Sequence, residues 1–127
     1  MIPSNLVRFF IGKNQPLEKL LKSENLENFS IIKMEQTHSD DFAEVSEENF
    51  LPEIRVVTIP KVDAVITTKK NILLSVKTAD CLPILIYWEN GLGSNSSGVA
   101  AIHSGRAGTE KKILTKVLLH LKNKYQV

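Results

Sequence analysis

The chain has 127 residues, of which 43% are hydrophobic and 24% charged, and its formal net charge is +2 at neutral pH. A chain of this length forms one domain with one core, and the composition is that of a soluble globular protein rather than a disordered or fibrous one. The small net charge argues against a nucleic-acid polymer as a partner, because such binding needs a basic face that releases many counterions.

The single cysteine, Cys81, cannot form a disulfide within the chain. The amino-terminal segment MIPSNLVRFF lacks the long apolar core and small-residue cleavage site of a secretory leader. We therefore expect a cytoplasmic protein. Apolar runs such as Leu82 to Trp88 are far shorter than the roughly 20 residues that cross a bilayer, so no membrane span is expected.

The amino-terminal part of the chain predicts two strands separated by a short helix. Leu6 to Ile11 is apolar and reads as a strand that the following Gly-Lys-Asn sequence ends. Pro16 suits the first position of a helix, whose leucines share one face until the polar residues that begin at Ser23. From Phe29 the alternation of residue types predicts a strand with His38 at its end.

The middle of the chain predicts a connecting segment, an extended piece and a hairpin. The acidic stretch from Asp40 to Glu53 has no clear period, and Ile54 to Ile59 follows as an extended piece. Val62 to Thr67 and Ile72 to Val76 are apolar runs separated by a polar Lys-Lys-Asn sequence, which predicts a β-hairpin.

The carboxyl-terminal part predicts two strands and the clearest helix of the chain. Leu82 to Trp88 and Val99 to Ile102 are the expected strands, and the glycine- and serine-rich residues from Asn90 to Gly98 are an expected surface loop. After a tight turn over 104–109, apolar residues spaced about 100° apart predict a helix that ends near Tyr125. Its expected sheet-facing stripe comprises Ile113, Leu114, Val117, Leu118 and Leu121, whereas Lys112, Lys116 and Asn123 face away.

Two of the three histidines and the only cysteine fall where expected strands meet loops. A thiolate and two imidazoles from His38, Cys81 and His103 would bind one zinc ion and leave a fourth position for water or substrate. Taken singly, His38 could be an exposed loop histidine, Cys81 a small buried hydrophobic residue and His103 a residue that ends a strand. The spacing contains no close ligand pair, so spacing alone does not establish a metal site. His120 lies inside the last helix at the edge of its apolar stripe, so we expect it at a boundary or on the surface and outside the site.

The turn over 104–109 is a second candidate site. Exposed backbone N–H groups and Arg106, together with Gly105 and Thr109, favour an anion such as phosphate. A plain turn before a helix explains the same segment slightly better, because the pattern is short and lacks a phosphate-loop signature.

Four segments of the chain form an ordered set of motifs: Gln36–Ser39, Val62–Thr67, Thr78–Pro83 and Ala101–Thr109. Ala-Asp-Cys-Leu-Pro is the most distinctive element of this set. In this order they resemble the motifs of the laccase-domain, or polyphenol oxidase, family, whose members are described as purine nucleoside phosphorylases.

The resemblance implies that the family's two-histidine, one-cysteine metal site maps onto His38, Cys81 and His103. It also implies an α/β fold, with a mixed β-sheet core covered by helices. The implied reaction uses phosphate to split adenosine, inosine, guanosine or methylthioadenosine into the free base and the corresponding ribose 1-phosphate, and family members are also described as adenosine deaminases. From their positions beside Cys81 and His38, we expect Asp80 and Gln36 to orient the metal ligands. Ordinary hydrogen bonding at a strand end explains these two residues equally well.

The chain departs from the family pattern in two ways. Arg106 stands where the family usually has a tryptophan, which replaces an aromatic wall by a charged group. Family members also continue well beyond the last predicted helix. We therefore expect residues 1–127 to be a single laccase-like domain that lacks its carboxyl-terminal part. Either the chain is a fragment, or the remaining wall of the site comes from another chain, as in a homo-oligomer.

Three alternatives remain open. A copper-dependent polyphenol oxidase is the nearest, but Met34, the candidate axial ligand, lies about 13 Å from His38 along an extended strand. A cysteine hydrolase would use Cys81 as nucleophile and His103 as base, which requires the two side chains to be adjacent. The third alternative is a catalytically silent fragment or an interaction module.

Overall fold

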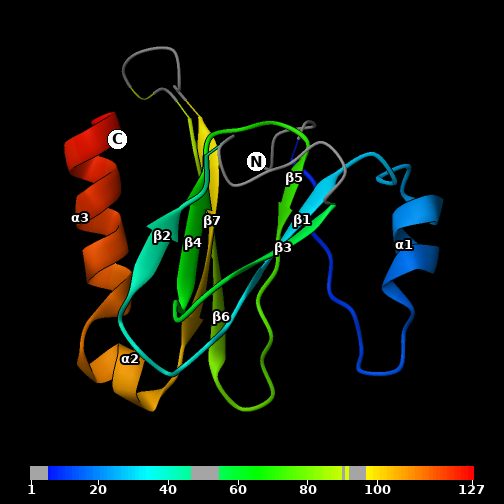
Figure 1. Cartoon of the computed structure of the whole chain (residues 1–127). Coiled ribbons are helices and arrows are strands. Elements are labelled where there is room, and N and C mark those ends of the chain that lie inside the picture. Colours follow the sequence, from blue (N-terminus) through cyan, green and yellow to red (C-terminus); the bar gives the residue numbers. More distant parts are fainter. Residues whose placement is uncertain (1–5, 47–54, 90, 92–96) are drawn as a thin grey trace.

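The computed structural model describes residues 6–46, 55–89, 91 and 97–127. Figure 1 shows the course of the chain through the helices and strands of these ranges. In chain order they are α1 (Leu17–Ser23), β1 (Ser30–Met34), β2 (Phe42–Glu44), β3 (Val56–Ile59), β4 (Ala64–Thr67), β5 (Ile72–Leu74), β6 (Leu82–Trp88), β7 (Gly98–Ser104), α2 (Arg106–Glu110) and α3 (Ile113–Tyr125).

The strands form two sheets. In the three-stranded sheet, of order β3-β1-β5, the central strand β1 runs parallel to both neighbours. In the four-stranded sheet, of order β2-β4-β7-β6, β2 and β4 are parallel, and β7 is antiparallel to both β4 and β6. The expected hairpin of β4 and β5 is wrong, because the turn between them carries the chain from one sheet to the other.

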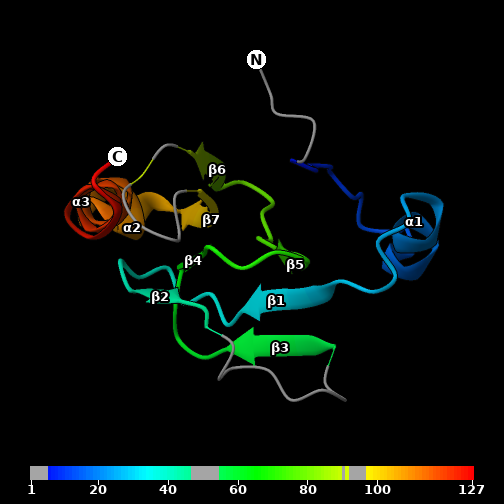
Figure 2. The ribbon, with the colours of Figure 1, turned by 90° about the horizontal axis from the view of Figure 1, so that it is seen from above.

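The two sheets pack against each other between helices, as the views in Figures 1 and 2 show. One apolar cluster joins α3 to the outer face of the four-stranded sheet, and a second lies between the sheets. A third cluster joins α1 to the far face of β1. This arrangement confirms the expected α/β class, a mixed β-sheet core covered by helices.

Strand β4 shows that both faces of the four-stranded sheet are buried by apolar side chains. All four of its residues are buried. Ala64 and Ile66 pack in the α3 cluster, whereas Val65 faces the other sheet, so the alternation of a strand serves two layers. Strand β7 repeats this pattern, with Ile102 toward α3 and Ala101 toward the other sheet.

Helix α3 lies on the sheet along a narrower stripe than its sequence indicates. Its buried residues are spaced four apart, at Ile113, Val117, Leu121 and Tyr125. Leu118, expected in the stripe, is 47% exposed. A straight helix touches a sheet along one line of residues, and this line runs through every fourth position. Lys112, Lys116 and Asn123 are exposed, as expected.

Four other sequence expectations change. Residues Leu6–Ile11 form no regular structure, and Phe10 is 81% exposed. The connecting segment expected over 40–53 contains β2, and the tight turn over 104–109 contains α2. Much of the expected surface loop, residues 90 and 92–96, lies outside the described residues, and Gly98 begins β7. No helix of the described ranges has the length and apolarity needed to cross a membrane.

Candidate metal site

The structure brings His38, Cys81 and His103 together. One ligand atom from each side chain lies within 4.8 Å of the others. His38 belongs to the loop between β1 and β2, Cys81 immediately precedes β6, and His103 is in β7. The β6–β7 register pairs Leu82 with Ser104, which sets Cys81 beside the end of β7.

The three side chains differ in exposure. His103 is buried, Cys81 is half-buried and His38 is exposed. The two imidazole rings meet edge to face, with centroids 5.0 Å apart and an interplanar angle of 76°. The cluster is therefore closed on the β7 side and open to solvent at His38.

Gly105 forms the floor of the cluster. A Cβ atom at this position would lie 3.0 Å from His38 Cδ2, 3.2 Å from Cys81 Sγ and 3.6 Å from His103 Cε1. The backbone itself is extended, with φ −79° and ψ −178°, so glycine is favoured here by the limited space rather than by conformation. The predicted site residue Gly105 thus lies beside all three candidate ligands, where any side chain would crowd them.

Asp63, which sequence reasoning did not select, is the hub of the polar contacts beneath the cluster. It is fully buried at the start of β4. Its Oδ1 lies 2.8 Å from His103 Nδ1. Its carboxylate also accepts hydrogen bonds from the backbone N–H groups of Thr37, His38 and Ser39, and from the Ser39 hydroxyl.

These donors keep Asp63 ionised. Burial alone would raise the pKa of the Asp63 carboxyl, but hydrogen bonds from Ser39, His103 and the backbone outweigh burial and lower the pKa to about 2. The signal for this residue in the sequence is a single acidic side chain at the start of an apolar run, Val-Asp-Ala-Val-Ile-Thr. Such a group is buried only when it is paired.

Gln36 and Asp80, the residues expected to orient the ligands, have different surroundings. The Gln36 amide donates to the Lys77 carbonyl at 2.8 Å and accepts from the Lys77 N–H at 2.8 Å. This pair joins the segment that leads to His38 to the segment that leads to Cys81. Asp80 is exposed.

The predicted phosphate-binding residues are only partly together. The Arg106 side chain is 94% exposed and lies 3.5 Å from Glu110, so it points away from the buried floor at Gly105. The Thr109 hydroxyl donates to the Gly105 carbonyl at 2.7 Å, and it therefore accepts the hydrogen bond from the Ser104 hydroxyl. Thr109 stabilises the turn rather than facing the cluster.

The donor set fits zinc. Zinc holds thiolate sulfur at about 2.3 Å and imidazole nitrogen at about 2.0 Å in a tetrahedron, so its ligand atoms lie roughly 3.3 to 3.7 Å apart. The 4.8 Å limit of the cluster is wider than these separations by about 1 Å, and His38, the exposed member, is the side chain with most freedom to move. Cys81 immediately precedes β6, and His103 lies in the neighbouring strand β7.

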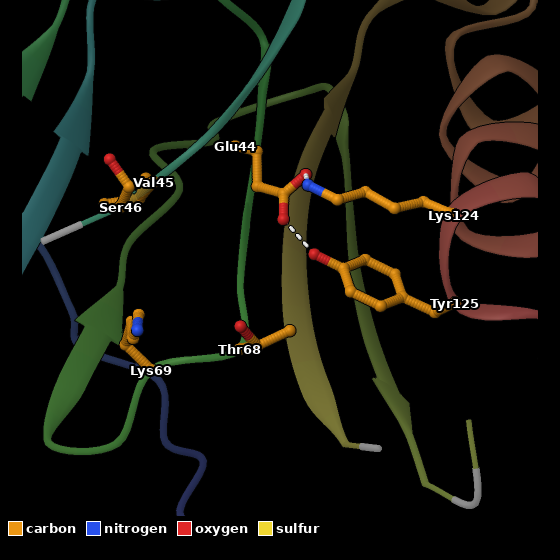
Figure 3. Close-up of a pocket in the computed structure, with 7 residues that line it drawn as sticks. All are labelled: Glu44, Val45, Ser46, Thr68, Lys69, Lys124 and Tyr125. Atoms are coloured by element: carbon orange, nitrogen blue, oxygen red, sulfur yellow. Dashed lines mark hydrogen bonds and ion pairs between the residues drawn. The ribbon is translucent and has the colours of Figure 1, made fainter. Parts of the chain in front are cut away.

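A different polar cluster lies at the opposite end of the four-stranded sheet, where α3 ends (Figure 3). Glu44 accepts hydrogen bonds from His120 at 3.0 Å, from Lys124 at 2.8 Å and from the Tyr125 hydroxyl. Burial raises the pKa of Glu44, but these three partners outweigh it and hold the pKa below its usual value. His120 is half-buried and outside the metal site, as expected. The pocket beside this cluster has a volume of about 300 Å³ and is lined by Glu44, Val45, Ser46, Thr68, Lys69, Lys124 and Tyr125.

Comparison with known families assigns this architecture. The model of the multi-copper polyphenol oxidoreductase laccase family matches residues 14–127. The chain belongs to this laccase family. The family expected from the sequence motifs is thereby confirmed, and the matched range includes His38, Cys81 and His103, the three candidate metal ligands.

Relatives of the laccase-family chain include named purine nucleoside phosphorylases. The one from Rickettsia prowazekii is 33% identical over 105 residues, which cover 80% of this chain and 39% of the relative. The one from Clostridium acetobutylicum is 35% identical over 92 residues, which cover 72% of this chain and 34% of the relative. The chain thus spans well under half the length of these relatives.

Two solved structures share the fold of the laccase-family chain. The hypothetical protein YfiH of Bacillus licheniformis superposes with a TM-score of 0.67 at 19% identity, over 85% of this chain and 39% of that protein. Protein NMB0706 of Neisseria meningitidis superposes with a TM-score of 0.58 at 24% identity, over 83% of this chain and 37% of that protein.

Proposed function

We propose that the protein is a zinc-dependent purine nucleoside phosphorylase that transfers the ribosyl group of a purine nucleoside to phosphate. The observation that carries this proposal is the cluster of His38, Cys81 and His103, in a family whose relatives are named for that reaction. Because the chain matches only 39% of the first relative, the substrate is proposed as a class: adenosine, inosine, guanosine or methylthioadenosine.

Zinc is favoured over copper by the residues around the cluster. A blue-copper site adds a weak axial methionine to two histidines and a cysteine. Met34 is buried in the apolar cluster between the sheets, where it packs with Ile32 and Val65 rather than with the metal cluster. The chain has three histidines in all, and His120 bonds to Glu44, which leaves two for a metal. A multicopper centre needs more.

In phosphorolysis, a phosphate oxygen bonds to the anomeric carbon while the glycosidic bond breaks. The bond's electron pair passes to the purine nitrogen, which takes up a proton. A bound zinc ion would supply positive charge and lower the pKa of bound water to about 7, which would also suit adenosine deamination. Because His38 is the exposed member of the cluster, we place the substrate on its side, and the absence of a side chain at Gly105 leaves the three candidate ligands uncrowded.

Arg106 is the residue that we propose for phosphate. Its guanidinium presents several donors to an anion, and its contact with Glu110 is a long, exposed one that costs little to break. It follows Gly105 directly, so a turn of its side chain brings it toward the cluster. A reducing cytoplasm would keep Cys81 as a free thiol for the metal, and a second copy of the chain is a candidate for the remaining wall of the nucleoside site.

A cysteine hydrolase is the second candidate function, and one observation favours it. Asp63, His103 and Cys81 are arranged in space like the acid, base and nucleophile of a catalytic triad. Asp63 Oδ1 lies 2.8 Å from His103 Nδ1, and Cys81 and His103 belong to the same cluster. In that reading His103 would take the thiol proton and no metal would be needed. The two functions differ in their response to a chelator.

The test is phosphate-dependent release of hypoxanthine from inosine by zinc-loaded protein. We expect release that requires phosphate, that is lost in Cys81→Ala and that a chelator abolishes until zinc is restored. The matched control is His120→Ala, which removes a histidine outside the cluster and should keep the activity. Absence of release by the zinc-loaded protein from every purine nucleoside would overturn the phosphorylase proposal. Ester hydrolysis that survives the chelator would favour the cysteine hydrolase instead.

A further inference from the structure

We infer that Asp63 is a positioning residue that prepares both histidines of the cluster for a metal before any metal binds. One carboxylate contacts His103 through its ring and His38 through the backbone. The inference rests on the metal site of the proposed function but not on the reaction performed there.

The first part of this role is to hold the His38 loop. His38 has a φ of 60°, a left-handed conformation that residues other than glycine rarely adopt. The consecutive N–H groups of Thr37, His38 and Ser39 all point to the Asp63 carboxylate, at 3.1, 3.1 and 2.8 Å. Successive N–H groups around a left-handed residue form a concave site for an anion, and here Asp63 is that anion. The carboxylate therefore fixes where the His38 side chain leaves the loop.

The second part is to choose the tautomer of His103. An ionised carboxylate only accepts hydrogen bonds, so the contact of 2.8 Å between Asp63 Oδ1 and His103 Nδ1 requires the proton on Nδ1. The other ring nitrogen, Nε2, is then unprotonated and has the lone pair that a metal needs. His103 is buried, so water does not compete for the Nδ1 contact.

The two carboxylate oxygens of Asp63 accept hydrogen bonds from different donors. Replacement by asparagine therefore tests the contact with His103 separately from the contacts with the loop. Oδ2 faces the N–H groups of Thr37 and Ser39 and the Ser39 hydroxyl, whereas Oδ1 faces the His38 N–H and His103 Nδ1. An asparagine keeps its single oxygen where more donors converge, at Oδ2. Its NH₂ group then points at His103 Nδ1 and donates to it, which moves the imidazole proton to Nε2.

The experiment reads the tautomer of His103 directly in metal-free protein by ring-nitrogen NMR at about pH 8, where an ordinary histidine is neutral. We expect the proton on Nδ1 in the parent protein and on Nε2 in Asp63→Asn. Zinc affinity, measured by competition with a chelator, should fall about 10- to 100-fold in the variant. A residue that only stabilises the fold would change neither the tautomer nor the zinc affinity of the folded fraction.

The matched control is Asp41→Asn, which removes the same charge from an exposed residue near the same loop. It should leave the tautomer and the zinc affinity unchanged. If Asp63→Asn does not fold, the parent protein still decides, because a proton on Nε2 of its His103 contradicts the inference. An unchanged tautomer and an unchanged affinity in Asp63→Asn also overturn it. A parent protein with the Nδ1 proton that binds no zinc would refute the proposed metal site and leave the tautomer assignment standing.

Discussion

Replacement of Gly105 by alanine tests whether the three side chains above it act as one metal site. The added Cβ would lie 3.0 Å from His38 Cδ2 and 3.2 Å from Cys81 Sγ, both below the 3.4 Å at which ordinary contact begins. The backbone conformation suits alanine, so the change acts only through these contacts. The exposed His38 ring is the group that must withdraw.

The size of the effect follows from the tolerance of metal bonds. The ring has to move by a few tenths of an ångström, whereas ligand distances in a working site hold to about 0.2 Å. We expect zinc affinity to fall about 10- to 100-fold, in the range that indirect ligand disturbance produces. Overpacking costs about 1 to 3 kcal/mol, partly offset by about 0.4 to 1 kcal/mol from the smaller entropy of the unfolded chain. The metal-free protein should therefore lose between about 0 and about 2.6 kcal/mol.

Zinc competition with a chelator and urea unfolding of the metal-free protein measure the two effects separately. Gly12→Ala is the matched control, because its Cβ would meet only the Gln15 side chain at 3.6 Å and should leave zinc affinity unchanged. Parental zinc affinity in Gly105→Ala would show that His38 and Cys81 do not converge on a common ion.

Three further predictions concern the core, the end of α3 and the phosphate site. Leu121→Ala, at a buried position on α3, should lower the free energy of unfolding by about 2 to 5 kcal/mol, whereas Leu118→Ala, on the exposed side, should change it by less than about 0.5 kcal/mol in urea titrations. Glu44→Gln should cost about 1 kcal/mol above pH about 4.3, and the difference from the parent should vanish at lower pH, because a lowered pKa contributes stability that is lost as the carboxylate is protonated. Arg106→Ala should raise the KM for phosphate about tenfold, with zinc affinity unchanged, in initial-rate assays.

Each of these predictions has a contrary outcome. Equal losses in the two leucine variants would mean that α3 is rotated on the sheet. A cost of Glu44→Gln that persists in acid would show that packing, not charge, holds the end of α3. An unchanged KM for phosphate in Arg106→Ala would place the anion elsewhere.

The sequence predicts the elements whose pattern is local and long. Helix α3 and strands β6 and β7 have enough apolar residues in register to be recognised alone. The three candidate ligands were found because histidine and cysteine are few and stand in distinctive motifs. His103 lies within β7, and Cys81 immediately before β6, close to the expected positions.

Other elements depend on partners that a single segment does not reveal. β2 is three residues long and exists because it pairs with β4. The apolar residues from Leu6 to Ile11 look like a strand but pair with no strand among the described residues, so their hydrogen bonds are not those of a sheet. The turn after β4 looks like that of a hairpin, yet β5 pairs with β1. Pairing over long sequence distances decided each case.

The site shows the same division. Asp63 was overlooked because its six donor groups come from a loop and a strand that are distant in the sequence, and nothing local marks it as a hub. Arg106 was placed in the site from its position in a motif, but its direction depends on α2, which exposes it. Residue types in the sequence identify candidate site residues, whereas the direction of each side chain follows from tertiary packing.

The loop to His38 and the segment to Cys81 both cross from the three-stranded sheet to the four-stranded one, and Gln36 ties them together through Lys77. The ligands therefore converge only after the two sheets have docked. A bound ion would cross-link the two sheets. Since contacts that form after the folding transition state affect only the rate of unfolding, the ion would slow unfolding strongly and leave the folding rate nearly unchanged. The occupancy of the site would then report that the whole domain is assembled.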